Sequence, residues 1–220
     1  MALILSLETT TTNCSVSLSK KGETLVLRED YNTKFSHAES LHVFIDEVVE
    51  SANIKLPEID AIAVSKGPGS YTGLRIGVSA AKGLCFSLDK PLISVSTLES
   101  LSHQINIEDG FIVPMLDARR MEIYSAIFDA SHHQIRETQA QILEESSFLD
   151  YLDKSMVYFI GNGVEKTKAL IQHENAVFVK DKLPSANEMG KLAFQKFRNN
   201  DFENVAYFEP YYLKDFIQFG

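Results

Sequence analysis

The stretch that decides the fold reads Ser65-Lys66-Gly67-Pro68-Gly69-Ser70-Tyr71-Thr72-Gly73-Leu74-Arg75-Ile76-Gly77. A short apolar run ends just before it and apolar residues at helical spacing follow it. The stretch therefore predicts a glycine-rich turn that leads from a strand into a helix. Such a turn directs backbone N–H groups toward an anion. A tight turn without a ligand has the same composition, and the residues alone leave both interpretations open.

The established phosphate-binding motifs do not match this turn. A P-loop requires a glycine, four residues and then Gly-Lys-Ser or Gly-Lys-Thr, whereas Thr72 stands five residues after Gly67 and no lysine follows it. The dinucleotide fingerprint places its third glycine at position 72, and Gly73 comes one residue late. For a nucleotide or phosphate contact made by this turn, the expected residues are Gly67, Gly69, Ser70 and Thr72.

The helix predicted after the turn, about residues 72–88, has small residues on one face. Gly73, Gly77, Ala80 and Ala81 share that face at about 100° per residue. Each glycine in a helix interior costs about 1 kcal/mol relative to alanine, so close packing against another backbone must compensate. The neighbouring backbone belongs either to the same domain or to a second subunit, and the residues leave both alternatives open.

The predicted elements occur twice in the same order. The first set comprises strands at 2–7, 14–19, 23–30, 59–65 and 92–95, with helices at about 36–52, 72–88 and 98–104. The second set comprises strands at 111–116, 121–128, 134–141 and 157–160, with helices at about 146–152, 164–173 and 186–197. Each set starts with three strands linked by hairpins and continues with a helix and a further strand. This order predicts two α/β halves of related topology.

Composition and charge narrow the classes of function. Acidic residues outnumber basic ones by 30 to 21, the net charge is −9, and no Lys/Arg cluster offsets it locally. Tight direct binding to a nucleic acid backbone is therefore disfavoured. Cys14 and Cys85 have no ligand-like pair near them in the sequence, so we expect core thiols. No apolar run approaches the roughly 18–20 residues of a membrane span and no secretory signal is visible, so we expect a cytoplasmic protein.

Residues suited to catalysis are few. His37 and His42 lie five residues apart, about 500° around a helix, so their imidazoles cannot reach one metal ion. No second carboxylate is spaced beside Glu8 for acid–base catalysis, and no serine or cysteine lies in a nucleophile elbow. We therefore expect neither a catalytic residue nor a metal site.

Four strings of this sequence together resemble the bacterial TsaB (YeaZ) family, which is involved in forming threonylcarbamoyladenosine at position 37 of tRNAs that read codons beginning with A. The most specific string runs from Gly67 to Gly77. The other three are Leu3 to Thr10, Asp117-Ala118-Arg119-Arg120 with Glu122 and Tyr124, and Pro210 to Leu213. They stand in the family's order and together span nearly the whole chain.

The resemblance implies an α/β fold of two ribonuclease-H-like (actin-like, ASKHA) subdomains, each with a mixed sheet flanked by helices. The expected subdomains are residues 1–104 and 105–220, with the last helix and the tail able to pack back on the first. The implied function is that of a non-catalytic subunit, which activates the catalytic homologue TsaD by forming a heterodimer with it. The ATPase TsaE is expected to join the assembly, while other chains hold most of the tRNA. No cofactor is expected to bind tightly, and ATP or ADP is expected to bind weakly at the partner interface.

The resemblance also places the partner interface on two helices of the first subdomain, and the same surface is expected to support a homodimer. The expected interface residues are Ser36, Ser40, Val43, Glu47, Gly73, Gly77, Ala80, Ala81 and Leu84. Two departures argue against catalysis by this chain alone. The catalytic family binds a metal through His-x-x-x-His on the corresponding helix, where this chain has only His37 and His42. Glu8 stands where nucleotide-binding relatives usually have aspartate.

An enzyme of another class is the alternative hypothesis. The chain would then act alone as a nucleotide-dependent phosphotransferase of the sugar-kinase type or as an M22-type metallopeptidase. That hypothesis requires a bound metal or a tightly bound nucleotide in the isolated chain. The subunit hypothesis expects no stoichiometric metal and at most weak nucleotide binding.

Overall fold

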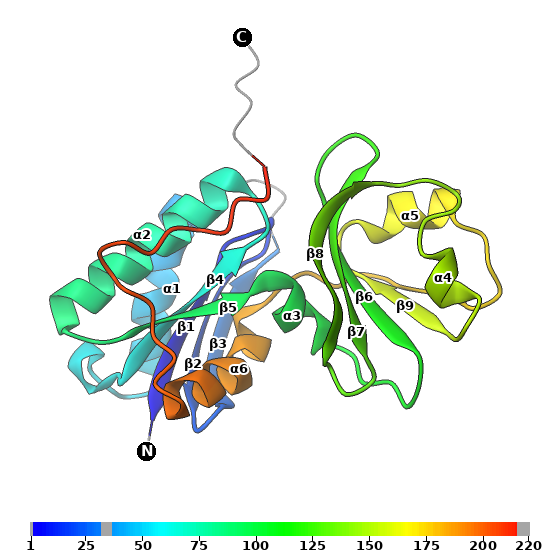
Figure 1. Ribbon diagram of the computed structural model, residues 1–220. Helices are drawn as coiled ribbons and strands as arrows, with labels where there is room; N and C mark the ends of the chain where they lie inside the picture. Colours follow the sequence, from blue (N-terminus) through cyan, green and yellow to red (C-terminus); the bar gives the residue numbers. More distant parts are fainter. Residues whose placement is uncertain (1, 32–36, 215–220) are drawn as a thin grey trace, which may run out of the picture. The chain divides into compact units, whose positions relative to one another are not determined.

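The computed structural model describes residues 2–31 and 37–214, which form two compact units (Figure 1). The first unit extends to Ser100 and also contains Pro184–Tyr212; the second unit contains Leu101–Leu183 and continues from Leu213. Residues 184–212 thus belong to the first unit, whereas a single cut at residue 104 assigns them to the second. The chain thus passes into the second unit after Ser100, returns to the first at Pro184 and passes to the second again at Leu213.

The sheet of the first unit consists of three hairpin-linked strands followed by two parallel ones. The strands are β1 (Leu3–Glu8), β2 (Cys14–Lys20), β3 (Glu23–Asp30), β4 (Ala61–Gly67) and β5 (Leu92–Ser96), in the order β3-β2-β1-β4-β5. β2 is antiparallel to both β1 and β3, while β4 is parallel to β1 and β5. Between β2 and β3, Lys21 and Gly22 have φ of 54° and 88°, values typical of a tight hairpin turn.

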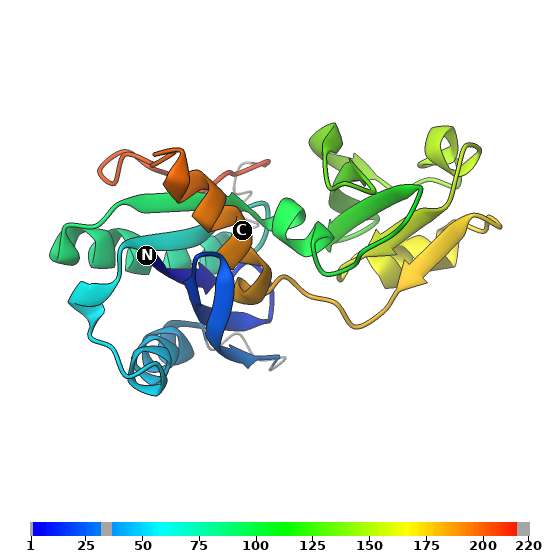
Figure 2. The same cartoon turned by 90° about the horizontal axis from the view of Figure 1, so that it is seen from below.

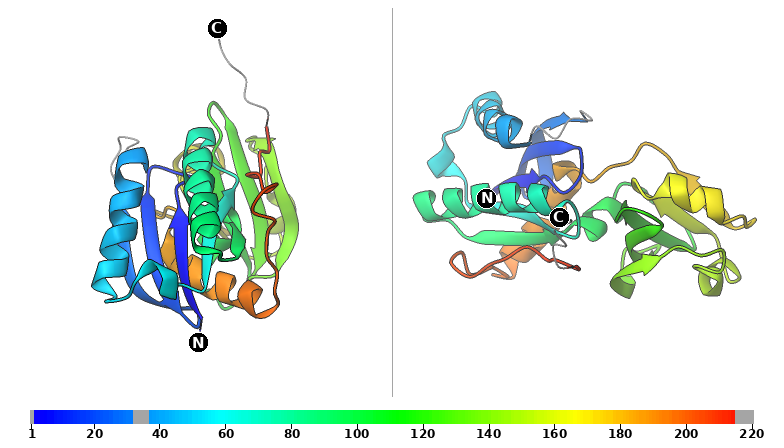
Figure 3. Two further views of the ribbon diagram at one scale, coloured as in Figure 1. Left: turned by 90° about the vertical axis from the view of Figure 1, so that its left-hand side faces the viewer. Right: turned by 90° about the horizontal axis from the view of Figure 1, so that it is seen from above.

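Helices cover both faces of this sheet (Figures 2 and 3). α1 (His37–Ser51) and α2 (Tyr71–Leu88) pack on one face, where Leu5 and Leu7 contribute to the core, and α6 (Ala186–Arg198) packs on the other face against Ile4. Successive side chains of a strand point to opposite faces, so β1 contributes to both cores. The two remaining helical segments are η1 (Leu56–Glu58) and α3 (Thr97–Ser102).

The second unit repeats the connectivity of the first. Its strands are β6 (Phe111–Asp117), β7 (Glu122–Asp129), β8 (Gln134–Ile142), β9 (Val157–Ile160) and β10 (Ala176–Val179), in the order β10-β9-β6-β7-β8. The first three strands are antiparallel and the last two run parallel to the first of them. The helices are α4 (Leu149–Leu152) and α5 (Val164–Leu170).

The predicted fold class is confirmed: two mixed five-stranded sheets, each flanked by helices. The expectation of two buried core thiols is also confirmed, because Cys14 and Cys85 are free and buried. β10 was missed, since its four residues are too short to show a period. The helix predicted at 164–173 ends at Leu170.

Among the described residues, no helix is long and apolar enough to cross a membrane.

Candidate functional site

The glycine-rich turn joins β4 to α2 and is covered on one side by the C-terminal strap, which we define as residues 203–212. Gly67 has a φ of 110°, and a Cβ there would lie 2.9 Å from the carbonyl oxygen of Tyr211. The backbone N–H of Tyr211 donates to the carbonyl oxygen of Lys66 at 2.7 Å. Only glycine adopts this φ freely and leaves room for the strap. Gly67 is therefore explained by packing against its own chain.

The turn between β1 and β2 covers the glycine-rich turn on another side. The N–H of Ser70 donates to the carbonyl oxygen of Thr10 at 2.7 Å, and a Cβ on Gly69 would lie 2.5 Å from the Cβ of Thr10. The Ser70 hydroxyl accepts from the N–H of Gly73 at 3.3 Å and so caps α2. Of the four predicted nucleotide contacts, Gly67 is buried, Gly69 and Ser70 are half-buried and Thr72 is exposed. A nucleotide contact at these residues stays a prediction.

The small-residue face of α2 packs against the same β1–β2 turn. A Cβ on Gly73 would lie 2.0 Å from the carbonyl oxygen of Thr9, and one on Gly77 would lie 2.3 Å from the Thr9 hydroxyl. That hydroxyl donates to the carbonyl oxygen of Gly73 at 2.7 Å, and Ala81 is fully buried. The space beside Gly73 and Gly77 is thus occupied by their own chain, and contact of Gly73, Gly77 and Ala81 with a partner stays a prediction.

The side of α1 and α2 that points away from the sheet presents a different set of residues. Val43 is 51% exposed and Phe86 is 86% exposed, while a Cβ on Gly83 would meet nothing within 4 Å. Ala80 and Leu84, also on α2, are half-buried and pack against the core of the first unit. We call Val43, Gly83 and Phe86 the α1–α2 outer face. Gly83 and Phe86 were absent from the sequence prediction, although Phe86 falls among the polar residues of the helical pattern.

The other predicted interface residues have diverse surroundings. Ser40 is half-buried. The carboxylate of Glu47 pairs with the guanidinium of Arg28 at 3.2 Å. Ser36 lies outside the described residues.

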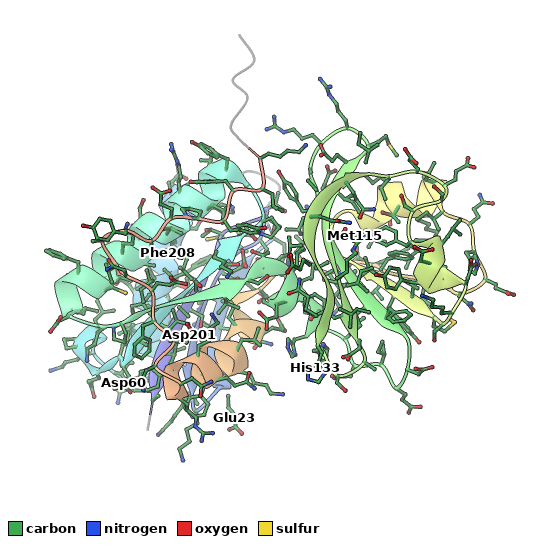
Figure 4. All side chains as sticks on the ribbon, in the orientation of Figure 1. Glu23, Asp60, Met115, His133, Asp201 and Phe208 are labelled. Carbon is green, nitrogen blue, oxygen red and sulfur yellow. The ribbon has the colours of Figure 1, made fainter. Side chains whose placement is uncertain are left out.

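The C-terminal strap runs beside α2 and β5. Glu203 pairs with Leu92 of β5, and the ammonium group of Lys82 donates to the carbonyl oxygens of Ala206 and Phe208 at 3.2 and 3.0 Å. Phe208, labelled in Figure 4, packs against the core on the α1–α2 face of the sheet. The strap therefore packs back on the first unit.

Glu8, at the end of β1, is fully buried beneath the same turn. Its Oε1 accepts hydrogen bonds from the backbone N–H and the hydroxyl of Thr10 at 2.6 and 2.5 Å. Burial raises the pKa of the Glu8 carboxyl, and hydrogen bonds from Ser65 and Thr10 only partly oppose this effect. Its other oxygen, Oε2, has no partner among the described residues. Glu8 therefore holds the β1–β2 turn and presents no carboxylate to solvent.

The two histidines considered for metal binding differ in burial. His37 is buried, with its Nε2 2.6 Å from the carbonyl oxygen of Thr11, whereas His42 is exposed. Within residues 2–31 and 37–214, no three His, Cys, Asp or Glu side chains are grouped to hold a metal ion.

Several known proteins similar to this chain belong to one family. Residues 32–217 match the family described as "TsaD: tRNA N6-adenosine threonylcarbamoyltransferase". The chain is 28% identical over 230 residues to the "tRNA threonylcarbamoyladenosine biosynthesis protein TsaB" of Escherichia coli strain K12, an alignment that covers 96% of this chain and 94% of that protein. A "tRNA N6-adenosine threonylcarbamoyltransferase" of Staphylococcus epidermidis is 35% identical over 129 residues, which cover 52% of this chain and 38% of that protein.

Among solved structures, a protein "with similarity to peptidase YEAZ" from Pseudomonas aeruginosa superposes with a TM-score of 0.85 at 25% identity. The superposition covers 97% of this chain and 100% of that one. Both units of the chain are therefore represented in this structure.

Proposed function

Because this chain belongs to the TsaB (YeaZ) family within the wider TsaD family, we propose that it is a non-catalytic subunit that heterodimerises with TsaD and activates it. Its relatives named TsaB support a role in the biosynthesis of threonylcarbamoyladenosine in tRNA. In this proposal TsaD transfers the threonylcarbamoyl group to N6 of adenosine 37. TsaE joins the assembly, and tRNA is held mainly by the other chains.

The observation that carries the proposal is the α1–α2 outer face. Phe86 is 86% exposed, one turn of helix from Gly83, where an added Cβ would meet no described residue within 4 Å. A glycine inside a helix costs about 1 kcal/mol relative to alanine, and among the described residues nothing packs beside Gly83 to compensate. A second backbone that approached Gly83 closely would supply the contact and would cover the Phe86 ring. A helix of TsaD is the proposed occupant, and a second copy of this chain is expected to compete for the same face.

The surroundings of the residues at the end of β1 support a non-catalytic role. Glu8 is buried and hydrogen-bonded to Thr10, so its carboxyl cannot contact a substrate in this conformation. Gly67 and Gly69 lie against backbone of their own chain, which limits the approach of phosphate to the turn. We expect at most weak binding of ATP or ADP, at the interface with the partner.

Size-exclusion chromatography of the purified chain with TsaD tests the interface. Phe86→Glu and Gly83→Arg should each lower the affinity for TsaD at least about tenfold, because each places a charge where apolar contact is expected. Ala80→Arg should also weaken binding. Leu25→Glu is the matched control: Leu25 is 53% exposed on β3, and its substitution places the same charge on an exposed apolar site away from α2. Undiminished co-elution of Phe86→Glu and Gly83→Arg would refute the proposed interface.

The family description names a transferase, so an enzyme activity of the lone chain is the second candidate. Calorimetry with ATP, metal analysis and a turnover assay on the isolated chain discriminate between the two. Tight binding of ATP, or turnover in the absence of TsaD, would favour the enzyme. Activity only when the chain is mixed with TsaD would favour the subunit.

A further inference from the structure

The turn between β6 and β7 places two arginines in an unusual backbone conformation. Arg119 and Arg120 follow one another with φ of 69° and 48°, in the left-handed region that favours glycine and asparagine. Both side chains are exposed. Side chains with a Cβ cost free energy at these positions, and no burial of their own compensates. The chain thus keeps two guanidinium groups at a site where glycine would be more stable.

Polar contacts from a neighbouring loop and helix hold this turn in place. The ammonium group of Lys166 on α5 donates to a carboxylate oxygen of Asp117 at 2.8 Å and to the carbonyl oxygens of Arg120 and Glu122 at 2.9 and 2.8 Å. The backbone N–H of Asp117 donates to the side chain of Asn162 at 2.8 Å. The turn is therefore rigid before any ligand arrives, which lowers the entropy lost on binding.

Two carboxylates near the turn are engaged by lysines rather than by Arg119. The carboxylate of Asp117 pairs with Lys166, and that of Glu122 pairs with Lys214. Over the described ranges, no ion pair engages the guanidinium of Arg119. Two adjacent arginines thus stand at the tip of this turn in a chain whose net charge is −9.

The position of the turn in the sheet is one that ligands commonly occupy. β6 and β9 are parallel, so their carboxyl ends, at Asp117 and Ile160, meet at the same edge. Ligands of open α/β sheets bind beyond the carboxyl ends of parallel strands. Tyr124, on β7, is half-buried and close enough to Arg119 for the guanidinium to lower the pKa of its phenol, although burial is the larger effect and raises it. The edge therefore combines two guanidinium groups with an aromatic ring.

We infer that Arg119 and Arg120 form a phosphate-binding site in the second unit and that its ligand is the phosphodiester backbone of RNA. Guanidinium groups bind phosphate oxygens in a bidentate manner, and an adjacent tyrosine offers a surface for a base or a ribose. The inference rests on the proposed function, because RNA is chosen over other phosphates from the tRNA pathway of the relatives. It adds a direct RNA contact to a chain otherwise expected to meet tRNA only indirectly.

The test is the affinity for fluorescently labelled, unmodified tRNA, measured by anisotropy for the full chain alone and mixed with TsaD, from about 50 to 200 mM salt. The test variant is Arg119→Asn with Arg120→Gly, residues that the turn conformation favours. Its melting temperature should equal or exceed that of the wild type, so misfolding cannot explain a loss. The matched control is Lys20→Gln with Lys21→Asn, which removes two charges from the β2–β3 turn, where Lys21 also has positive φ.

The expected result is an affinity about tenfold lower for the test variant at the lower salt, with a salt slope smaller by about two, one for each lost phosphate contact. The control should bind tRNA as the wild type does. Three results would each overturn the inference. They are an equal loss of affinity in both variants, no loss in the test variant, and no tRNA binding by the wild type either alone or mixed with TsaD.

Two further arms separate the sources of phosphate and the classes of partner. Displacement of labelled tRNA by ATP from the wild type but not from the test variant would overturn the RNA assignment in favour of a free nucleotide. Loss of co-elution with TsaD by the test variant would overturn it in favour of an acidic protein surface. Failure of the wild type to co-elute with TsaD would refute the proposed function, and the tRNA titration of the full chain alone would still decide the present inference.

Discussion

The two units share one topology and differ in how they treat the same edge of the sheet. In the first unit, the turn after β1 is buried, and the glycines of α2 pack against the backbone and hydroxyl of Thr9. In the second unit, the turn after β6 exposes Arg119 and Arg120, and α5 reaches it through the charged side chain of Lys166. One edge is closed by close packing and the other is kept open by polar contacts.

This difference suggests that, of two units with the same topology, one edge contributes to stability and the other to binding. Close packing of glycine against backbone is rigid and intolerant of added atoms. A turn held by an ammonium group and carbonyl oxygens keeps its shape while its side chains stay in solvent. We therefore expect substitutions at the first edge to change stability and those at the second to change binding.

The largest effect is expected for Gly73→Val. The new Cβ would lie 2.0 Å from the carbonyl oxygen of Thr9, so either α2 or the β1–β2 turn must move. We expect the free energy of unfolding to fall by about 3 kcal/mol or more, as for severe overpacking of a core. Urea denaturation measures the loss. The thiols of Cys14 and Cys85, whose pKa values burial raises to about 12, provide a local report on the first unit through their reactivity.

Gly83→Ala is the matched control on the same helix. Its Cβ would meet nothing within 4 Å, so only helix propensity changes, and we expect a gain of about 0.5–1 kcal/mol. A stability loss in Gly83→Ala, or none in Gly73→Val, would contradict the assignment of the closed and open faces of α2.

A smaller effect, visible as a pH dependence, is expected for Glu8→Gln. Burial raises the pKa of Glu8 above its ordinary value of 4.5, so the folded state binds more protons than the unfolded state above that pH. The Glu8 contribution to stability therefore falls as pH rises from 4.5 through the raised pKa, by up to about 1.4 kcal/mol per pH unit. The glutamine variant has no such ionisation, so its stability should decline less over this window. Parallel pH profiles of the two proteins, from urea unfolding, would argue against a raised pKa of Glu8.

The smallest effect is expected at the corresponding carboxylate of the second unit. Asp117→Asn keeps an oxygen for the N–H of Arg119 but removes the charge that pairs with Lys166 at 2.8 Å. Because the Asp117 side chain is 45% exposed, we expect a loss of about 0.5–1 kcal/mol, reduced in high salt. Thermal melting at low and high salt checks this. A loss as large as that of Gly73→Val would mean that the second edge is as tightly packed as the first.

Much of the fold was predictable from the sequence because its signals are local. Alternating and helical apolar patterns located nearly every strand and helix, and the repeated order of elements predicted the two related units. β10 was missed because four apolar residues, Ala176–Val179, have no distinguishing period. The return of α6 to the first unit depends on contacts between residues more than a hundred positions apart, such as Ser17 with Ala186.

The candidate site was predicted less well, because it too depends on contacts between residues distant in the sequence. The sequence alone determined that α2 is rich in small residues and that a glycine-rich turn precedes it, since composition and spacing are properties of the chain. Only the tertiary structure decided that Gly73 and Gly77 face Thr9 whereas Gly83 faces open space, and that the glycine-preferring conformation after β6 belongs to two arginines. A helical period states which residues share a face, but the neighbour that occupies that face is set by segments distant in sequence.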